Sequence, residues 1–270
     1  MTICIYHGNC ADGFGAAWVV RKALGDIEFY PGKYQEPPPD VAGKDVVMVD
    51  FSYKRPVLLE MAEKASSILI LDHHKSAAAD LVDLPQNVTA VFDMSHSGAM
   101  LAWEHFFPGA EPPPMLRHIE DRDLWRFALP HTRQVQANVF SHPYDFQVWD
   151  HLMSMSSEEL AADGIAIERK HFKDMKELLG VTRRELVIHG HRVPAANLPH
   201  TMSSDAGHEM AQGHPFAACY FDTPEGRVFS LRSTDTGVDV SEIAKTYGGG
   251  GHRNAAGFKV SFAEAKAFEL

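Results

Sequence analysis

Three short apolar segments, each followed at once by polar residues, constrain the fold of this chain most strongly. Residues 2–6, 44–50 and 67–71 are predicted to form buried strands. Helical patterns lie between them, over residues 14–24 and 56–65. Strands that alternate with helices indicate an α/β domain built on a parallel sheet. Because ligands bind outside the carboxyl ends of such strands, we expect the polar residues there to lie along one edge of the sheet.

The remainder of the chain predicts a second, smaller α/β domain joined to the first by a helix. A length of 270 residues favours two domains. The boundaries are expected at 1–185, including the connecting helix, and at 186–270. Further helices are expected over 98–106, 115–120 and 240–247, a long charged helix from 157 that ends or is interrupted near Gly180, and strands over 186–193, 216–221 and 227–233.

Composition excludes several classes of protein. No apolar segment approaches the roughly 20 residues that a membrane span needs, and the N-terminus lacks a secretory signal, so we expect no membrane partner and a cytoplasmic location. A net charge of -11 argues against coating long nucleic acid, although a short nucleotide could still bind a local basic pocket. Cys4, Cys10 and Cys219 form no C-x-x-C pair, so neither a zinc ribbon nor a disulfide framework is indicated.

Clustered His and Asp residues stand at the three strand ends. Asp72-His73-His74 follows one strand, Asp50 ends the second, and His7 and Asp12 flank the turn after the first. Imidazole with carboxylate suits Mn, Fe or Zn, and carboxylates suit Mg or Mn. Each cluster alone could be an ordinary strand-end turn or a helix cap. Three such ends in one sheet favour a metal site.

A fourth acidic group, Glu120-Asp121-Arg122-Asp123, follows a short predicted helix. Such a charge cluster is usually a solvated face. Trp125 and Phe127 come directly after it and indicate a partly buried segment, so one carboxylate can point inward. We expect Asp121 or Asp123 to be a ligand, and the spacing does not choose between them.

A run of four glycines near the C-terminus, Gly248 to Gly251, precedes His252 and Arg253. Without side chains, Gly249, Gly250 and Gly251 let backbone N–H groups approach a phosphate closely. His252 and Arg253 can add charge-assisted hydrogen bonds, and Arg232 on the preceding strand can add a second cation. The small residues 255–257 are expected to begin a helix. The alternatives are a flexible linker for the glycines and a surface position for Arg232.

These residues together resemble the DHH phosphoesterases with their DHH-associated C-terminal domain. The resemblance rests on the Asp72-His73-His74 triplet, Asp50, the His7/Asp12 turn and the late GGGGHRNAAGF stretch, and it spans nearly the whole chain. It implies a parallel α/β domain, a helical linker, a smaller α/β domain and an active site in the cleft. Family members include single-strand exonucleases, nano-RNases, cyclic-dinucleotide phosphodiesterases, phosphatases of adenosine 3′,5′-bisphosphate and pyrophosphatases.

The resemblance also implies roles for individual residues. Asp50 is similar to the carboxylate that bridges two Mn²⁺ ions, with Mg²⁺ as an alternative, about 3.5–4 Å apart. His7 would bind one ion, and Asp12, His73 and either Asp121 or Asp123 the other. The candidate catalytic residues are His74, similar to the substrate-facing histidine, and Asp72, similar to the carboxylate that orients it. Arg232, Gly249, Gly250, Gly251 and His252 resemble the substrate-binding part.

One position departs from the family pattern. The usual first motif has a second aspartate two residues before Asp12, where this chain has Cys10 next to Asn9. A thiol or an amide is a poorer ligand for a hard divalent ion, so this ion is expected to bind more weakly, to use Asn9 or Cys10, or to need substrate.

The function expected first is hydrolysis of phosphodiester bonds in short oligonucleotides or linear dinucleotides, as in nano-RNases. A phosphatase of adenosine 3′,5′-bisphosphate-type nucleotides and a catalytically weak nucleotide-binding protein are the alternatives. A pyrophosphatase is disfavoured, because the glycine-rich stretch resembles the nucleotide-associated form of the second domain. The oligomeric state, a homodimer included, stays open.

Overall fold

The computed structural model describes all of residues 1–270, and the chain forms two compact units, Met1–Arg169 and Lys170–Leu270. The boundary lies within helix α8 (Ser157–Thr182), so the second unit includes the end of that helix. The division that the sequence suggested near residue 186 assigns the whole helix to the first unit instead.

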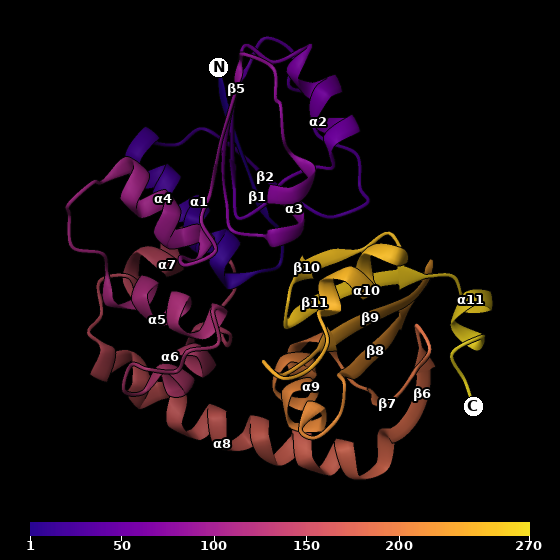
Figure 1. The fold of residues 1–270 in the computed structure, drawn as a ribbon. Helices are drawn as coiled ribbons and strands as arrows, with labels where there is room; N and C mark the ends of the chain where they lie inside the picture. The colour runs from indigo at the N-terminus through magenta and orange to yellow at the C-terminus, as the bar shows by residue number, and fades with distance from the viewer. The chain divides into compact units, whose positions relative to one another are not determined.

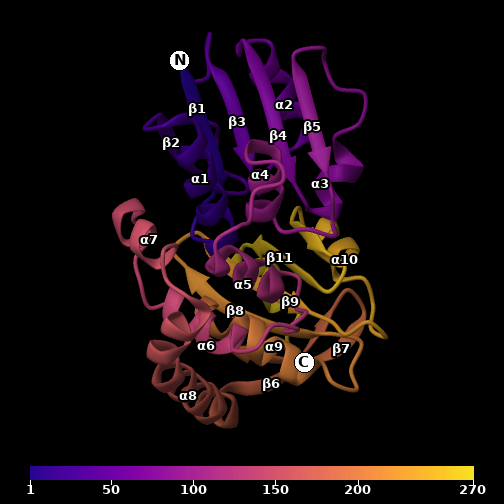
Figure 2. The same ribbon diagram turned by 90° about the vertical axis from the view of Figure 1, so that its left-hand side faces the viewer.

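The first unit contains a five-stranded parallel sheet in the order β2-β1-β3-β4-β5, seen face-on in Figure 2. Its strands are β1 (Thr2–His7), β2 (Glu28–Gly32), β3 (Asp45–Val49), β4 (Ser67–Asp72) and β5 (Val88–Phe92). The predicted parallel α/β domain is confirmed. Pairing of Tyr6 with Val49, and of Val49 with Leu71, brings the carboxyl ends of the three central strands to one level.

Helices cover both faces of this sheet because its apolar residues alternate (Figure 1). Ile3 and Ile5 pack into a core with helix α2 (Arg55–Ala62), whereas Cys4, between them, faces a second core. The other helices are α1 (Ala11–Leu24), α3 (Lys75–Asp80), α4 (Gly98–Phe106), α5 (Pro114–Asp123), α6 (Thr132–Val139) and α7 (Phe146–Leu152). The second core receives apolar residues from α1, α4, α5, α6, α7 and the start of α8.

The second unit contains a six-stranded mixed sheet in the order β10-β11-β9-β8-β7-β6. Its strands are β6 (Arg183–Ile188), β7 (His191–Asn197), β8 (Ala217–Thr223), β9 (Gly226–Arg232), β10 (Gly250–His252) and β11 (Ala255–Val260). Its helices are η1 (His200–Met202), α9 (Ser203–Ala211), α10 (Val240–Thr246) and α11 (Phe262–Lys266). Only β7 and β8 pair in parallel.

Two expectations about this unit were wrong. The single strand expected over 186–193 is a hairpin, because His189 and Gly190 both have positive φ and form a tight turn between β6 and β7. The helix start expected at 255–257 is the beginning of strand β11. Its small residues pack closely between two neighbouring strands, and a Cβ on Gly257 would make a tight contact with the Phe229 carbonyl oxygen, at 3.0 Å.

Candidate metal centre

Asp50 occupies the centre of the polar cluster at the carboxyl edge of the first sheet. It directly follows β3 with φ 52°, a left-handed conformation that Asp tolerates better than most residues. Its N–H donates to the Leu71 carbonyl at 2.9 Å, which fixes it against β4. A Cβ on Gly98 would lie 2.4 Å from the Asp50 Cβ. The start of helix α4 therefore packs directly against this carboxylate, which is 1% exposed.

The two carboxylate oxygens of Asp50 face two different histidines. Oδ1 lies 3.1 Å from His73 Nε2, and Oδ2 lies 3.4 Å from His7 Nδ1. Oδ2 is buried and accepts no hydrogen bond. Two groups of potential ligands share Asp50, one with His7 and His74 and the other with Asp12 and His73, and within each group the donor atoms lie within 4.8 Å of one another. A carboxylate that bridges two cations needs this arrangement.

Asp12, in the first turn of α1, joins the cluster to helix α4. Its Oδ2 accepts a hydrogen bond from the Gly98 N–H at 2.6 Å, and its Oδ1 accepts one from the Ala99 N–H at 3.0 Å. These N–H groups have no acceptor within the helix, and the positive end of the helix dipole stabilises the carboxylate. Oδ2 is also 3.6 Å from His73 Nε2.

The structure places Asp121 and Asp123, the two candidate ligands between which the sequence spacing did not choose, in different surroundings. Asp121 is buried, but its carboxylate accepts hydrogen bonds from the N–H groups of Ala128 and Leu129 and from the Thr132 hydroxyl. It fixes the loop after α5. Asp123 Oδ2 instead lies 3.5 Å from His73 Nε2. Geometry therefore favours Asp123 over Asp121 as a ligand.

Asp72 orients the histidine that follows it by two residues. Its Oδ1 is 2.7 Å from His74 Nδ1 and also accepts from the backbone N–H groups of His73 and His74. Ser52 Oγ donates to Oδ2 at 2.6 Å. Nδ1 of His74 thus donates its proton to a carboxylate, which leaves Nε2 as the nitrogen that can act on a ligand. His74 Nδ1 also lies 3.9 Å from Asp50 Oδ1.

The electrostatics of the cluster favour bound cations. Burial, followed by the charges of Asp50 and Asp123, raises the pKa of Asp12 well above its usual range, and burial also raises the pKa of Asp123. Burial alone would raise the pKa of Asp50, but its close contacts with the His7 and His73 imidazoles hold it well below its usual range. Although burial opposes it, the Asp50 hydrogen bond and the Asp123 charge raise the pKa of His73 to about 11.

Two buried carboxylates and one half-buried carboxylate that repel one another, and a buried carboxylate oxygen with no donor, fit divalent metal ions. His7, Asp12, Asp50, His73 and Asp123 are the residues that could hold them.

Sequence reasoning missed Tyr34, which borders the same cluster. Its ring centroid lies 5.4 Å from that of His7 and 6.1 Å from that of His74, and it packs against Phe51 at 5.0 Å. Tyr34 follows β2, a short edge strand that carries Pro31 and in which only Gly32 is buried. Because nothing predicted that strand, no local pattern could direct attention to the tyrosine behind it.

In the second unit, the sheet register aligns the two side chains expected to bind substrate, Arg232 and His252. Ala255 of β11 pairs with Arg232 of β9 on one side and with His252 of β10 on the other. Directly opposed residues project from the same face, so the small Ala255 separates the two longer side chains. Arg232 Nη2 donates to Ser204 Oγ at 2.8 Å, and its stem packs over Gly207 of α9.

The glycine run in the same unit has a structural cause of its own. A Cβ on Gly249 would lie 2.0 Å from the Gly257 carbonyl, and one on Gly251 would lie 2.5 Å from the Ala255 carbonyl. The run is therefore an ordered part of the sheet edge and not a flexible linker. Arg253, next to His252, donates to the carbonyls of Asp235 and Gly237 and so holds a turn.

Comparisons with known proteins identify the family. Residues 197–268 match the DHHA1 domain. The chain is 31% identical to the uncharacterized protein R106 of Acanthamoeba polyphaga mimivirus, over 96% of this chain and 67% of that protein. Its fold is similar to that of the pGpG-specific phosphodiesterase PggH from Vibrio cholerae, with 13% identity, 98% and 95% coverage and a TM-score of 0.51. The chain belongs to the DHH phosphoesterase family.

Another structure with the fold of this DHH phosphoesterase is RecJ from Thermus thermophilus, solved with Mn²⁺. The identity is 14% and the TM-score 0.54, over 99% of this chain and 50% of RecJ. Membership makes the protein a hydrolase of phosphate esters, and its His and Asp clusters suit divalent metal ions. No helix of this DHH phosphoesterase is both long and apolar enough to cross a membrane.

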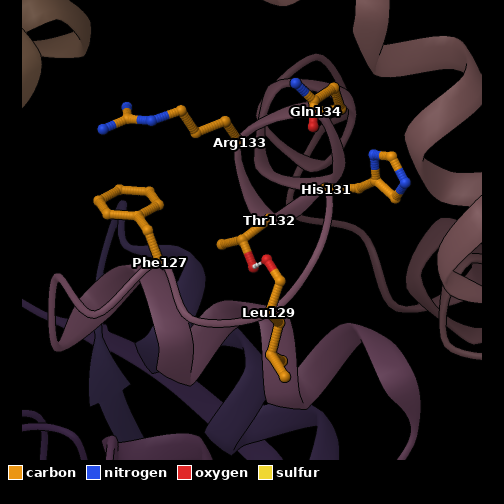
Figure 3. A pocket seen from close by; sticks show the side chains of 6 residues that line it. All are labelled: Phe127, Leu129, His131, Thr132, Arg133 and Gln134. Carbon is orange, nitrogen blue, oxygen red and sulfur yellow. Dashed lines mark hydrogen bonds between the residues drawn. The ribbon is translucent and has the colours of Figure 1, made fainter.

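A shallow hollow of about 210 Å³ lies on the loop and helix after Asp123 (Figure 3). The Arg133 guanidinium stacks over the Phe127 ring there, 3.9 Å from its centroid, and the Thr132 hydroxyl oxygen lies 3.3 Å from the Leu129 carbonyl oxygen. The residues that line it are Phe127, Leu129, His131, Thr132, Arg133 and Gln134. None is a candidate ligand, so the hollow is distinct from the metal centre of this DHH phosphoesterase.

Proposed function

We propose that the protein is a metal-dependent phosphodiesterase that cleaves very short oligonucleotides or linear dinucleotides, using two divalent ions such as Mn²⁺, with Mg²⁺ as an alternative. The observation that carries the proposal is the placement of the two Asp50 oxygens toward His73 and His7. One carboxylate is thereby available to two ions. His7 would hold one of them, and Asp12, His73 and Asp123 would hold the other.

When bound, divalent ions polarise water and neutralise charge on phosphoryl oxygens. The residues of this chain do the rest. His74, oriented by Asp72, presents Nε2 for a hydrogen bond to substrate. Asp12 links the ligand set to the start of helix α4, so that its carboxylate keeps its position when the charge of the cluster changes.

A short nucleotide substrate is supported by charge and by the second unit. A protein with net charge -11 is unsuited to long nucleic acid, whereas the Arg232 cation and the His252 imidazole lie at one level of a sheet. Cations of this kind bind phosphate oxygens through charge-assisted hydrogen bonds. The backbone of Gly249, Gly250 and Gly251 would lie against the substrate beside them. The fold of PggH, whose described substrate is the dinucleotide pGpG, agrees with this size.

The test is hydrolysis by the purified protein of linear dinucleotides, adenosine 3′,5′-bisphosphate and pyrophosphate, with Mn²⁺, with Mg²⁺ and with a chelator. We expect dinucleotides to be cleaved to mononucleotides with Mn²⁺ and no reaction with the chelator. Preferred release of phosphate from the bisphosphate would replace the proposal by a phosphatase. Binding of dinucleotide without any turnover, under every metal condition, would indicate a nucleotide-binding protein.

A further inference from the structure

Tyr34 is an exposed aromatic residue at the edge of the metal centre. It lies on the loop after β2 and is 44% exposed. Its ring centroid is 5.4 Å from that of His7, a candidate metal ligand, and 6.1 Å from that of His74, the candidate substrate-facing histidine. Exposed aromatic rings are ordinary on protein surfaces. This one, however, lies beside two histidines that the proposed reaction uses.

A buried ring and a tight turn hold Tyr34 in place. It packs against Phe51, which is fully buried, with the two ring centroids 5.0 Å apart. The Glu36 N–H donates to the Lys33 carbonyl at 3.2 Å and closes a turn that contains Tyr34. Three prolines follow at 37–39, and their φ angles are fixed. A ring held in this way loses little conformational freedom when a ligand contacts it.

The chemistry of the ring indicates the class of ligand. Phosphate groups are bound by cations, and the cation of this turn, Lys33, is paired with Glu36 at 3.5 Å. An aromatic ring instead stacks on nucleobases, because every base has a π-face. In a nucleotide the base is one sugar away from its phosphate. A phosphate held beside His7 and His74 therefore brings a base close to the Tyr34 ring.

We propose that Tyr34 stacks on the base of the nucleotide whose phosphate binds at the metal centre, and so favours nucleotides over phosphate esters that have no base. The inference rests on the phosphodiesterase proposed above and adds a specificity-determining residue to it. Because stacking tolerates every base, the presence of a base matters more than its identity. The stacked surface is the ring and not the hydroxyl, so phenylalanine should replace tyrosine at this position.

Steady-state kinetics with Tyr34→Leu test the stacking. Leucine keeps an apolar contact with Phe51 but has no aromatic face. Loss of one stacked base should raise KM for a dinucleotide by about 5- to 150-fold. Tyr34→Phe should keep the wild-type KM. Phe262→Ala, which removes a 45% exposed ring from the second unit, should keep it as well. An unchanged KM in Tyr34→Leu, or an equal rise in Tyr34→Phe, overturns the proposal.

A dinucleotide analogue without bases separates stacking from a general loss of activity. With this abasic substrate, Tyr34→Leu and the wild type should have the same kcat/KM, because there is no base to stack. Their metal content, measured by elemental analysis, should also be the same. An equal fall in kcat/KM for both substrates, or loss of metal from Tyr34→Leu, would show that Tyr34 only supports the metal centre and overturns the proposal.

Base fluorescence tests the same contact without turnover. The monophosphate of 2-aminopurine riboside should lose fluorescence on binding to the metal-loaded wild type, because stacking quenches this base. Tyr34→Leu should bind it about 5- to 150-fold more weakly, and Tyr34→Phe as tightly as the wild type. Absence of quenching, or equal affinity of wild type and Tyr34→Leu, overturns the proposal. Dinucleotide hydrolysis that Tyr34→Leu leaves unchanged would reject the inference alone, whereas Tyr34-dependent quenching without any hydrolysis would reject only the proposed function.

Discussion

At the scale of single residues, Asp50 combines an unusual backbone with a buried carboxylate. Its left-handed conformation turns the chain at the end of β3 and leaves one oxygen facing each of two histidines. Local strain of this kind persists only where the surrounding structure enforces it, and here Gly98 leaves space for it by having no side chain. The carboxylate therefore has one position and two sets of neighbours.

Replacement of this carboxylate should remove both ions together. Asp50→Asn keeps a residue that tolerates positive φ, so the fold should survive. We expect metal content, measured by elemental analysis, to fall at both positions. Dinucleotide hydrolysis should fall more than about 100-fold, beyond the range typical of residues that act only through a ligand. Asp163→Asn, an exposed acid on α8, is the control. Substantial turnover of Asp50→Asn at saturating Mn²⁺ would disprove the shared carboxylate.

At the scale of elements, helix α5 carries Asp123 and is fixed by a buried polar network. His118 Nδ1 lies 2.9 Å from Thr132 Oγ1 of α6, and its Nε2 lies 2.8 Å from Ser157 Oγ at the start of α8. The Thr132 hydroxyl in turn donates to Asp121. One histidine thus connects three helices close to the candidate ligand.

The pH dependence of stability should report this histidine. Burial is the largest cause that lowers the pKa of His118 in the folded protein. The unfolded chain, with an ordinary histidine pKa of about 6.5, then binds more protons near that pH. The His118 contribution to stability is therefore present above the unfolded pKa and is lost as the pH falls below it. In urea unfolding of metal-loaded protein from pH 7 to 5, His118→Gln should lose less stability than wild type. Parallel curves for the two proteins would refute this.

A second prediction concerns strands β9 and β10, whose register aligns Arg232 with His252. Because these residues lie in the second unit, Arg232→Ala should raise KM for dinucleotides by about 10-fold or more, as expected for loss of a charge-assisted hydrogen bond, and leave metal content unchanged. Arg227→Ala is the matched control. Arg227 lies at the other end of β9, paired with Asp222. Loss of bound metal in Arg232→Ala would show that the division of roles between the units is wrong.

At the scale of the whole molecule, each unit has its own core, and all the proposed metal ligands belong to Met1–Arg169. The four tryptophans, Trp18, Trp103, Trp125 and Trp149, belong to the same unit. Their fluorescence therefore reports the unfolding of the unit that binds metal, without a contribution from the other.

Metal should stabilise that unit by mass action. An ion present at 100 times its Kd contributes about 2.7 kcal/mol, which for a unit of this size raises the unfolding midpoint by about 5–10 °C. We expect this rise in the tryptophan fluorescence midpoint on adding Mn²⁺, and its reversal by a chelator. Asp50→Asn should show little response. An equal rise in that variant would mean that Mn²⁺ binds elsewhere.

The sequence by itself determined the parallel sheet and the polar edge that it carries. Apolar segments ending in His7, Asp50 and Asp72 suffice, because parallel strands place their carboxyl ends together whatever the details of their connections. Strands β2 and β5 escaped prediction because edge strands bury less and carry weaker apolar patterns.

Only the tertiary structure favours one of Asp121 and Asp123 as the ligand. Both acids lie near the end of the same helix. Their spacing does not say which of them will accept hydrogen bonds from the loop that follows. The N–H groups of Ala128 and Leu129 and the Thr132 hydroxyl donate hydrogen bonds to Asp121, whereas the Asp123 carboxylate lies near His73. Side-chain direction at the end of an element depends on contacts made by distant residues, and these exist only once the chain has folded.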